Sequence, residues 1–191
     1  MKNPCLTVLA AIACLSGFAQ HRTLLHCGKL LDGVNNSLQP EMTVVVEGNK
    51  ITSVQRGYVV AAGTDRVVDL KSKTVLPGLI DMHVHIESET RRGGAYKAGV
   101  KIAFGTDAGV YPHGMNAREF EFMVEGGMSP LNAIKAATMV NAELLGMKTQ
   151  LGSVEMGKFA DLIAVDESPL QTIKTLQTVW FVMKEGKIYK Q

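Results

Sequence analysis

The sequence lacks a charge excess and a cysteine framework, and each absence excludes a class of protein. Only 20% of its 191 residues are charged and the formal net charge is +2, so nothing indicates a nucleic-acid or acidic partner. Three cysteines are present, but Cys5 and Cys14 both lie within the first twenty residues. If that segment is removed, Cys27 stands alone and no internal disulfide framework can form.

The sequence also lacks an apolar run long enough to span a bilayer. The apolar run at residues 6–15 has the length of the core of an export signal. Lys2 gives it a basic start, and residues 17–19 place small side chains where a signal peptidase reads. We expect residues 1–19 to be a signal peptide and the protein to be exported, periplasmic or extracellular, without a transmembrane segment. A lipoprotein-type cleavage before Cys14 and a buried N-terminal helix are the alternatives.

Both ends of the remaining chain carry β-type patterns. Residues 23–76 contain several short apolar stretches, of which 42–46 is the strongest, and the turn at 47–50 leads into another. β-type patterns return over residues 151–189. Short strands at this spacing predict a small sandwich. No internal repeat and no low-complexity tract interrupts them.

The middle of the chain carries the chemistry. The stretch VLPGLIDMHVH at residues 75–85 is a Pro-Gly turn followed by an apolar run that ends in His83 and His85. Residues two apart in a strand point to the same face, so the two imidazoles would project side by side. Neutral imidazole is a good ligand for zinc and its neighbours. The alternative interpretation is a core strand that happens to end in His-x-His.

A second apolar strand is expected at residues 100–104, followed by helices. Asn116 is expected to cap the first helix, with Glu119 as its capping-box partner. The glycines at 126–127 would end that helix. Ser129 followed by proline then predicts a new helix start.

Three stretches resemble one known family, the amidohydrolase superfamily. VLPGLIDMHVH at residues 75–85 resembles its first barrel strand, and FGTDAG at 104–109 resembles its last. GKFADLIAVD at 157–166 is similar to the stretch where the chain re-enters a small β-domain. GVYPHG at 109–114 resembles the branch of imidazolonepropionases and Xaa-Pro dipeptidases. The chain is identified as a member of this superfamily.

The resemblance implies a (β/α)₈ barrel that carries the site and a β-sandwich assembled from both chain ends. Asp107 follows His85 by only 22 positions (107 − 85), whereas a barrel of this type needs roughly 200 residues. Most of the barrel is therefore expected to be missing. The expected fold is α+β, with a composite β-sandwich of residues 20–76 and 148–191. A truncated barrel, residues 77–147, would keep the first and last strands with their helices.

The resemblance also assigns roles to particular residues. In the family, paired histidines hold one or two divalent metal ions, typically zinc, and the aspartate of the last strand binds the metal and shuttles the proton. These roles fall on His83, His85 and Asp107. Amide hydrolysis of this kind needs a Lewis acid, which lowers the pKa of bound water to about 7, and a carboxylate that moves the proton. His113 is a candidate substrate-binding residue, with an exposed loop histidine as the alternative. The family's other metal ligands match no region of this sequence.

Two functions stay open from the sequence. The motifs predict a metal-dependent amidohydrolase that cleaves a C–N bond in a small-molecule, dipeptide-like or cyclic amide. The missing strands predict impaired activity or a catalytically dead remnant, because three ligands need rigid support and an outer shell to hold zinc. A binding module built on the sandwich is a third and weaker hypothesis. Exposed barrel edges would favour self-association.

Overall fold

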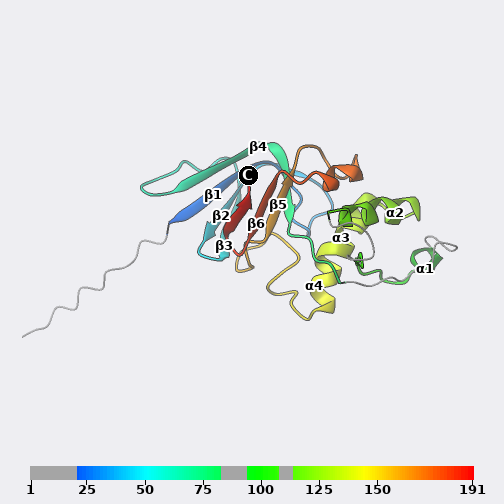
Figure 1. The fold of residues 1–191 in the computed structure, drawn as a ribbon. Helices are drawn as coiled ribbons and strands as arrows, with labels where there is room; N and C mark the ends of the chain where they lie inside the picture. The colour runs from blue at the N-terminus through cyan, green and yellow to red at the C-terminus, as the bar shows by residue number, and fades with distance from the viewer. Residues whose placement is uncertain (1–20, 83–93, 108–113) are drawn as a thin grey trace, which may run out of the picture.

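The computed structural model describes residues 21–82, 94–107 and 114–191 (Figure 1). Within these ranges, strands from both ends of the chain join one mixed seven-stranded sheet in the order β3-β2-β1-β4-β5-β6-β7. Its strands are β1 (Arg22–Leu30), β2 (Gln39–Glu47), β3 (Lys50–Arg56), β4 (Arg66–Pro77), β5 (Leu162–Val165), β6 (Phe181–Lys184) and β7 (Lys187–Lys190).

Strand β4 joins the two parts of the sheet. It runs parallel to β1, with Leu25 opposite Val68, and its last residues pair antiparallel with β5, with Val75 opposite Ala164. Since this single long strand pairs on both sides, the strands expected to form a sandwich are connected into one continuous sheet.

The sheet curls around an apolar core. The Ile51 N–H donates to the Lys158 carbonyl (3.0 Å), and the Gly186 N–H donates to the Ala160 carbonyl (3.0 Å). Residues 157–160 therefore lie between edge strand β3 and the turn that joins β6 to β7. The core inside the curl takes buried side chains from both parts of the chain, among them Leu25, Val44, Leu70, Leu162, Phe181 and Met183.

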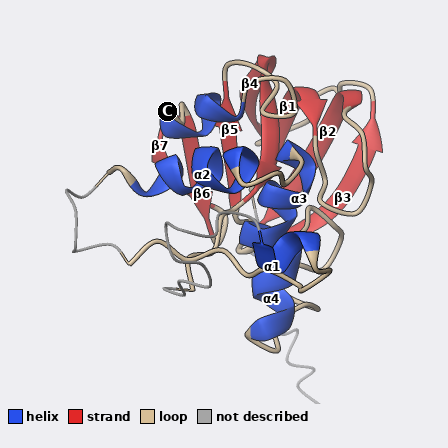
Figure 2. Cartoon of the chain, turned by 90° about the vertical axis from the view of Figure 1, so that its right-hand side faces the viewer, coloured by secondary structure: helices blue, strands red, loops and turns tan. Residues whose placement is uncertain are grey.

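Helices cover the other side of β4 and β5 (Figure 2). They are α1 (Gly94–Lys97), the 3-10 helix η2 (Asn116–Arg118), α2 (Glu119–Glu125), α3 (Pro130–Lys135), the π-helix η3 (Ala136–Val140), α4 (Asn141–Leu144) and the 3-10 helix η4 (Ile173–Gln177). Val75 faces the first core, whereas the next residue, Leu76, faces a second core with Phe104, Phe120 and Ile134. The end of β4 is therefore covered on both faces, which explains its unbroken apolar sequence. No helix within the described ranges has the length and apolar character needed to cross a membrane.

The helix signals in the sequence are confirmed in two cases and wrong in one. Ser129 caps α3 through its hydroxyl, which accepts from the Asn132 N–H, and α2 ends at Glu125 with Gly126 as its C-cap. The capping box at Asn116 is absent: the residue before α2 is Arg118, and no side chain caps that end. The Asn116 amide instead donates to the Thr106 hydroxyl (3.0 Å), a tertiary partner that replaces the local one.

The two apolar stretches expected to be barrel strands are also different from the prediction. Strand β4 ends at Pro77, and residues 78–82 and 100–107 are not in strands. Part of their backbone hydrogen bonding goes to the helical part: the Ile80 N–H donates to the Ala137 carbonyl in the π-helix η3 (2.7 Å). This helix thus occupies a hydrogen-bonding position that a neighbouring strand would fill in a complete ladder.

Candidate functional site

Two segments carry the described parts of the metal-site motifs. We call residues 78–82 the histidine segment, because it leads to His83, and residues 102–107 the aspartate segment, because it ends at Asp107. The Met82 N–H donates to the Phe104 carbonyl (3.0 Å). The two segments are therefore paired directly before the residues to which the sequence assigns metal binding.

A polar cluster strengthens this pairing. The Asp81 carboxylate accepts from the Thr106 N–H (3.1 Å) and from the Thr106 hydroxyl. The Asn116 amide lies 3.4 Å from the same carboxylate. Thr106 is fully buried, so its hydroxyl needs a partner inside the protein, and Asp81 supplies one from the other segment.

Asp107 has an unusual backbone. It is half-buried, and its φ of +47° lies in the left-handed region. Aspartate adopts this conformation more readily than most residues because its short side chain can bond locally. Such backbone strain clusters at functional sites, and here it falls on the residue to which the resemblance gives the catalytic role.

The other sequence-predicted site residues lie outside the described ranges. His83 and His85 fall within residues 83–93, and His113 falls within residues 108–113. Among the described residues, no group of three or more His, Cys, Asp or Glu side chains could hold a metal ion. Asp107 is the described member of the proposed ligand set. Two imidazoles and one carboxylate are donor types that zinc accepts, so the set fits the metal by its chemistry.

Sequence reasoning missed the residues that connect the segments. Asp81 and Thr106 lie inside the motifs, but neither was given a role. Asn116 was interpreted as a helix cap, and Asn141 was given no role. The signal for Asn141 was an amide side chain within the mostly apolar stretch 136–142, AATMVNA, where a buried polar group demands partners.

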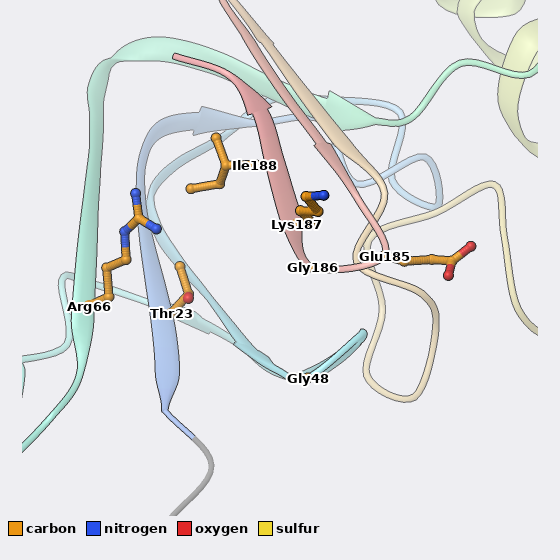
Figure 3. A pocket seen from close by; sticks show the side chains of 7 residues that line it. All are labelled: Thr23, Gly48, Arg66, Glu185, Gly186, Lys187 and Ile188. Atoms are coloured by element: carbon orange, nitrogen blue, oxygen red, sulfur yellow. The ribbon is translucent and has the colours of Figure 1, made fainter.

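A groove at the far end of the sheet has no connection with these motifs. It has a volume of about 510 Å³ and is lined by Thr23, Gly48, Arg66, Glu185, Gly186, Lys187 and Ile188. Thr23 and Arg66 lie on paired strands at the start of β4, whereas the histidine segment follows the end of β4. Figure 3 shows the Glu185 side chain directed away from Arg66. We assign no part of the proposed reaction to this groove.

Known sequences similar to this chain include an ochratoxinase, dihydroorotases and a 5-methylthioadenosine/S-adenosylhomocysteine deaminase. Ochratoxinase of Aspergillus niger is 50% identical over 103 residues, which are 51% of this chain and 21% of that protein. A dihydroorotase of Syntrophus aciditrophicus is 33% identical over 85 residues, 41% of this chain and 20% of that protein. The chain thus spans about a fifth of the length of the curated relatives that it matches.

Solved structures share the fold. A Xaa-Pro dipeptidase with methionine bound in its active site has a TM-score of 0.81 at 20% identity, and the match covers 89% of this chain and 100% of that one. The A. niger ochratoxinase structure has a TM-score of 0.71 at 16% identity, with 89% and 96% covered. An adenosine deaminase of Xanthomonas campestris with bound zinc has a TM-score of 0.66 at 10% identity, with 88% and 92% covered.

A family model supplies the assignment that the three motifs predicted. The model of the amidohydrolase family matches residues 91–189, which is more than half of the chain. The match includes the aspartate segment, the helices and the return into the sheet. This chain belongs to the amidohydrolase family.

Proposed function

We propose that this protein is a metal-dependent amidohydrolase with reduced activity, acting on a C–N bond of a peptide-like or cyclic amide. The observation that carries the proposal is the direct pairing of the histidine and aspartate segments, through Met82 to Phe104 and Thr106 to Asp81. This pairing keeps the chain immediately before His83 beside the chain that ends at Asp107.

Each site residue has a role in this proposal. His83, His85 and Asp107 would hold a divalent cation, zinc by the chemistry of its donors. When bound, the cation would polarise the amide carbonyl and make water a better nucleophile. The Asp107 carboxylate would take the proton of the attacking water and pass it to the leaving nitrogen. His113, six residues after Asp107, would contact the substrate.

The reduced activity follows from the length of the chain between the motifs. Only 22 positions (107 − 85) lead from His85 to Asp107, so the other strands of a (β/α)₈ barrel cannot lie between them. The site would lack the ligands and the outer shell that such strands supply. A catalytically inactive remnant is the second candidate function, and the same spacing favours it.

The names of the relatives support the reaction class and leave the substrate to be tested. A peptide-like substrate is supported by the structural neighbour described as a Xaa-Pro dipeptidase, and the sequence relatives include an ochratoxinase and dihydroorotases. We therefore propose Xaa-Pro dipeptides, other dipeptides and cyclic amides as the test panel.

Metal content and amide hydrolysis decide between the two candidates. The full chain, loaded with Zn²⁺ and dialysed, is expected to retain about one zinc per chain, measured by mass spectrometry of the metal, and to hydrolyse a member of the panel slowly. His83→Ala and Asp107→Asn should each lose the metal. Asparagine tolerates the left-handed backbone of Asp107, so the second change removes the charge with little strain. The matched control is His21→Ala, because His21 is exposed beside β1.

A folded wild-type chain that retains no zinc and cleaves no panel member would show that the protein is the inactive remnant. If both single variants, His83→Ala and Asp107→Asn, retain zinc, the metal is bound at another site of the chain.

The location of the protein is a separate proposal. The apolar run at residues 6–15 and the small residues Gly17 and Ala19 support export with cleavage before Gln20. N-terminal sequencing of the protein from the periplasm or the medium tests this. A product that begins at Met1 and stays with the cytoplasm would contradict it.

A further inference from the structure

One helix of this protein contains a π turn beside the two segments. Helix α3 continues through the π-helix η3 (Ala136–Val140) into α4. π turns occur often at functional sites because they redirect backbone and side-chain groups out of the regular helical pattern. Here the Ala137 carbonyl accepts a hydrogen bond from the Ile80 N–H of the histidine segment (2.7 Å).

The residue directly after this π turn, Asn141, bonds to both segments with one side chain. Its Nδ2 donates to the Ile80 carbonyl (2.7 Å) and to the Phe104 carbonyl (2.8 Å). Its Oδ1 accepts from the Phe104 N–H (3.1 Å). Asn141 is fully buried, so water cannot replace these bonds, and its side-chain amide satisfies both the N–H and the C=O of Phe104, as a residue of a neighbouring strand would.

The positions of these bonds relative to the proposed ligands are symmetrical. Ile80 lies three residues before His83, and Phe104 lies three residues before Asp107. A side chain that bonds both backbones at these points sets how far one segment is shifted along the other. That shift decides whether imidazole and carboxylate donors can meet at one ion.

We propose that Asn141 is a positioning residue that sets the register between the histidine and aspartate segments, and thereby the geometry of the metal site. The part of this inference that concerns the metal site rests on the proposed function, because it takes His83, His85 and Asp107 as the ligands. The part that concerns the register of the two segments can be measured without metal.

The experiment compares Asn141→Leu with Thr138→Val in the full chain. Leucine branches at Cγ as asparagine does, with methyl groups in place of the amide oxygen and nitrogen, and it is larger but can make none of the hydrogen bonds. Thr138 is the matched control: it is also fully buried in the same helix, but its hydroxyl bonds only within that helix, to the Ile134 carbonyl (2.8 Å). Both variants lose buried hydrogen bonds, but only the first loses bonds to the segments.

Two readouts separate positioning from stability. Amide hydrogen exchange at Met82 and Thr106 reports the pairing of the segments, since these N–H groups bond across it and not to Asn141. Asn141→Leu should accelerate their exchange beyond the acceleration seen in the β1 and β2 core, and Thr138→Val should not.

The affinity for Co²⁺ of the folded protein and the visible absorption of the bound ion report the metal site. Asn141→Leu should weaken binding roughly 10- to 100-fold and change the spectrum, whereas Thr138→Val should leave both unchanged.

The outcomes distinguish this inference from the proposed function. A wild-type chain that binds no Co²⁺ would contradict the proposed function, and the exchange rates at Met82 and Thr106 would then decide the role of Asn141 in register. A wild-type chain that binds Co²⁺, with the same affinity and spectrum in Asn141→Leu, would overturn the positioning role and leave the proposed function intact. If Asn141→Leu does not fold, Asn141→Asp, which keeps the shape and the acceptor oxygen, takes its place in both measurements.

Discussion

At the scale of single residues, polar side chains supplement the backbone bond between the two motif segments. Asp81 and Thr106 bond to each other across the segments, and Asn141 bonds to both segments. Thr106 and Asn141 are fully buried, and a buried polar group without a partner is costly. The pairing is thus specified by a small number of directional bonds rather than by apolar packing alone.

Another directional contact, between Arg22 and Asp65, gives a pH-dependent prediction. The guanidinium donates from Nε to Oδ1 (2.9 Å) and from Nη2 to Oδ2 (2.6 Å). These hydrogen bonds hold the pKa of Asp65 below its ordinary value of 3.8. Arg22→Gln should return the pKa of Asp65 toward that value, measured by NMR titration of the carboxyl carbon. An unchanged pKa in the variant would contradict the pairing.

The direction of the effect on stability follows from the same shift. The pKa of Asp65 is lower in the folded chain than in the unfolded chain, so the pair stabilises the fold above pH 3.8, and this contribution is lost as the pH falls through the folded value. The difference in unfolding free energy between wild type and Arg22→Gln should therefore be largest near neutral pH and should shrink in acid.

Cys27 gives a prediction about reactivity. Its thiol is fully buried on β1, and burial raises its pKa to about 12. Since the thiolate is the reactive form, a Cys5→Ser/Cys14→Ser variant should not react with a thiol reagent at pH 8 until it is unfolded. Spectrophotometric titration of thiols with and without denaturant measures this. Rapid reaction of the folded variant would show that β1 opens readily.

At the scale of elements, the start of α3 is set by a local signal. The Ser129 hydroxyl accepts from the Asn132 N–H (3.2 Å), and Pro130 occupies the first helical position. Ser129→Ala should lower the free energy of unfolding by about 1 kcal/mol, measured by chemical denaturation. Ser129→Asp restores an N-cap acceptor and should recover most of the loss. Equal losses in both variants would mean that the cap contributes little.

The chain after β4 shows the opposite situation, in which a local signal is overruled. The apolar run after the Pro-Gly turn predicts a second strand over residues 79–85. In the structure, β4 ends at Pro77, and the described residues after it, 78–82, are not in a strand. The Gly78 N–H donates to the Asp161 carbonyl (2.8 Å), and the Ile80 N–H donates to Ala137. Tertiary partners directly before β5 and in the π-helix η3 hold the chain there instead.

At the scale of the whole molecule, the curled sheet includes a close approach between its two parts. A Cβ atom on Gly186, in the turn from β6 to β7, would lie 2.0 Å from the Gly48 carbonyl oxygen, in the turn from β2 to β3. Real Cβ atoms do not approach a backbone oxygen so closely. Glycine at this position therefore lets the two ends of the curled sheet meet.

A pair of alanine substitutions tests this contact. Gly186 has φ +75° and Gly57 has φ +83°, but a Cβ at Gly57 would meet nothing within 4 Å. Gly57→Ala should lower the free energy of unfolding by about 1–2 kcal/mol, the cost of a side chain on a left-handed backbone. Gly186→Ala should lower it by the same amount and by roughly 1–3 kcal/mol more, because one of the two turns must move. Thermal and chemical unfolding of the two variants measure the difference, and equal losses would mean that the turns do not touch.

The sequence by itself determined the family, the β-rich ends, the end of α2, the start of α3, and the residues proposed to hold a metal. Each of these is carried by neighbours in the chain: a motif, an alternation of apolar residues, or a cap such as Ser129. Local patterns can specify them because the interacting groups are at most a few residues apart.

Only the tertiary structure decided that β4 unites the strands of both chain ends into one sheet. It also decided that the Asn116 side chain bonds Thr106 instead of capping a helix, and that Asn141 connects the two motif segments. The physical reason is distance along the chain. Asn141 bonds residues 37 and 61 positions away, and no local pattern specifies which distant backbone group a buried amide will meet. That choice is made when the helices pack against β4 and the buried polar groups must find their partners.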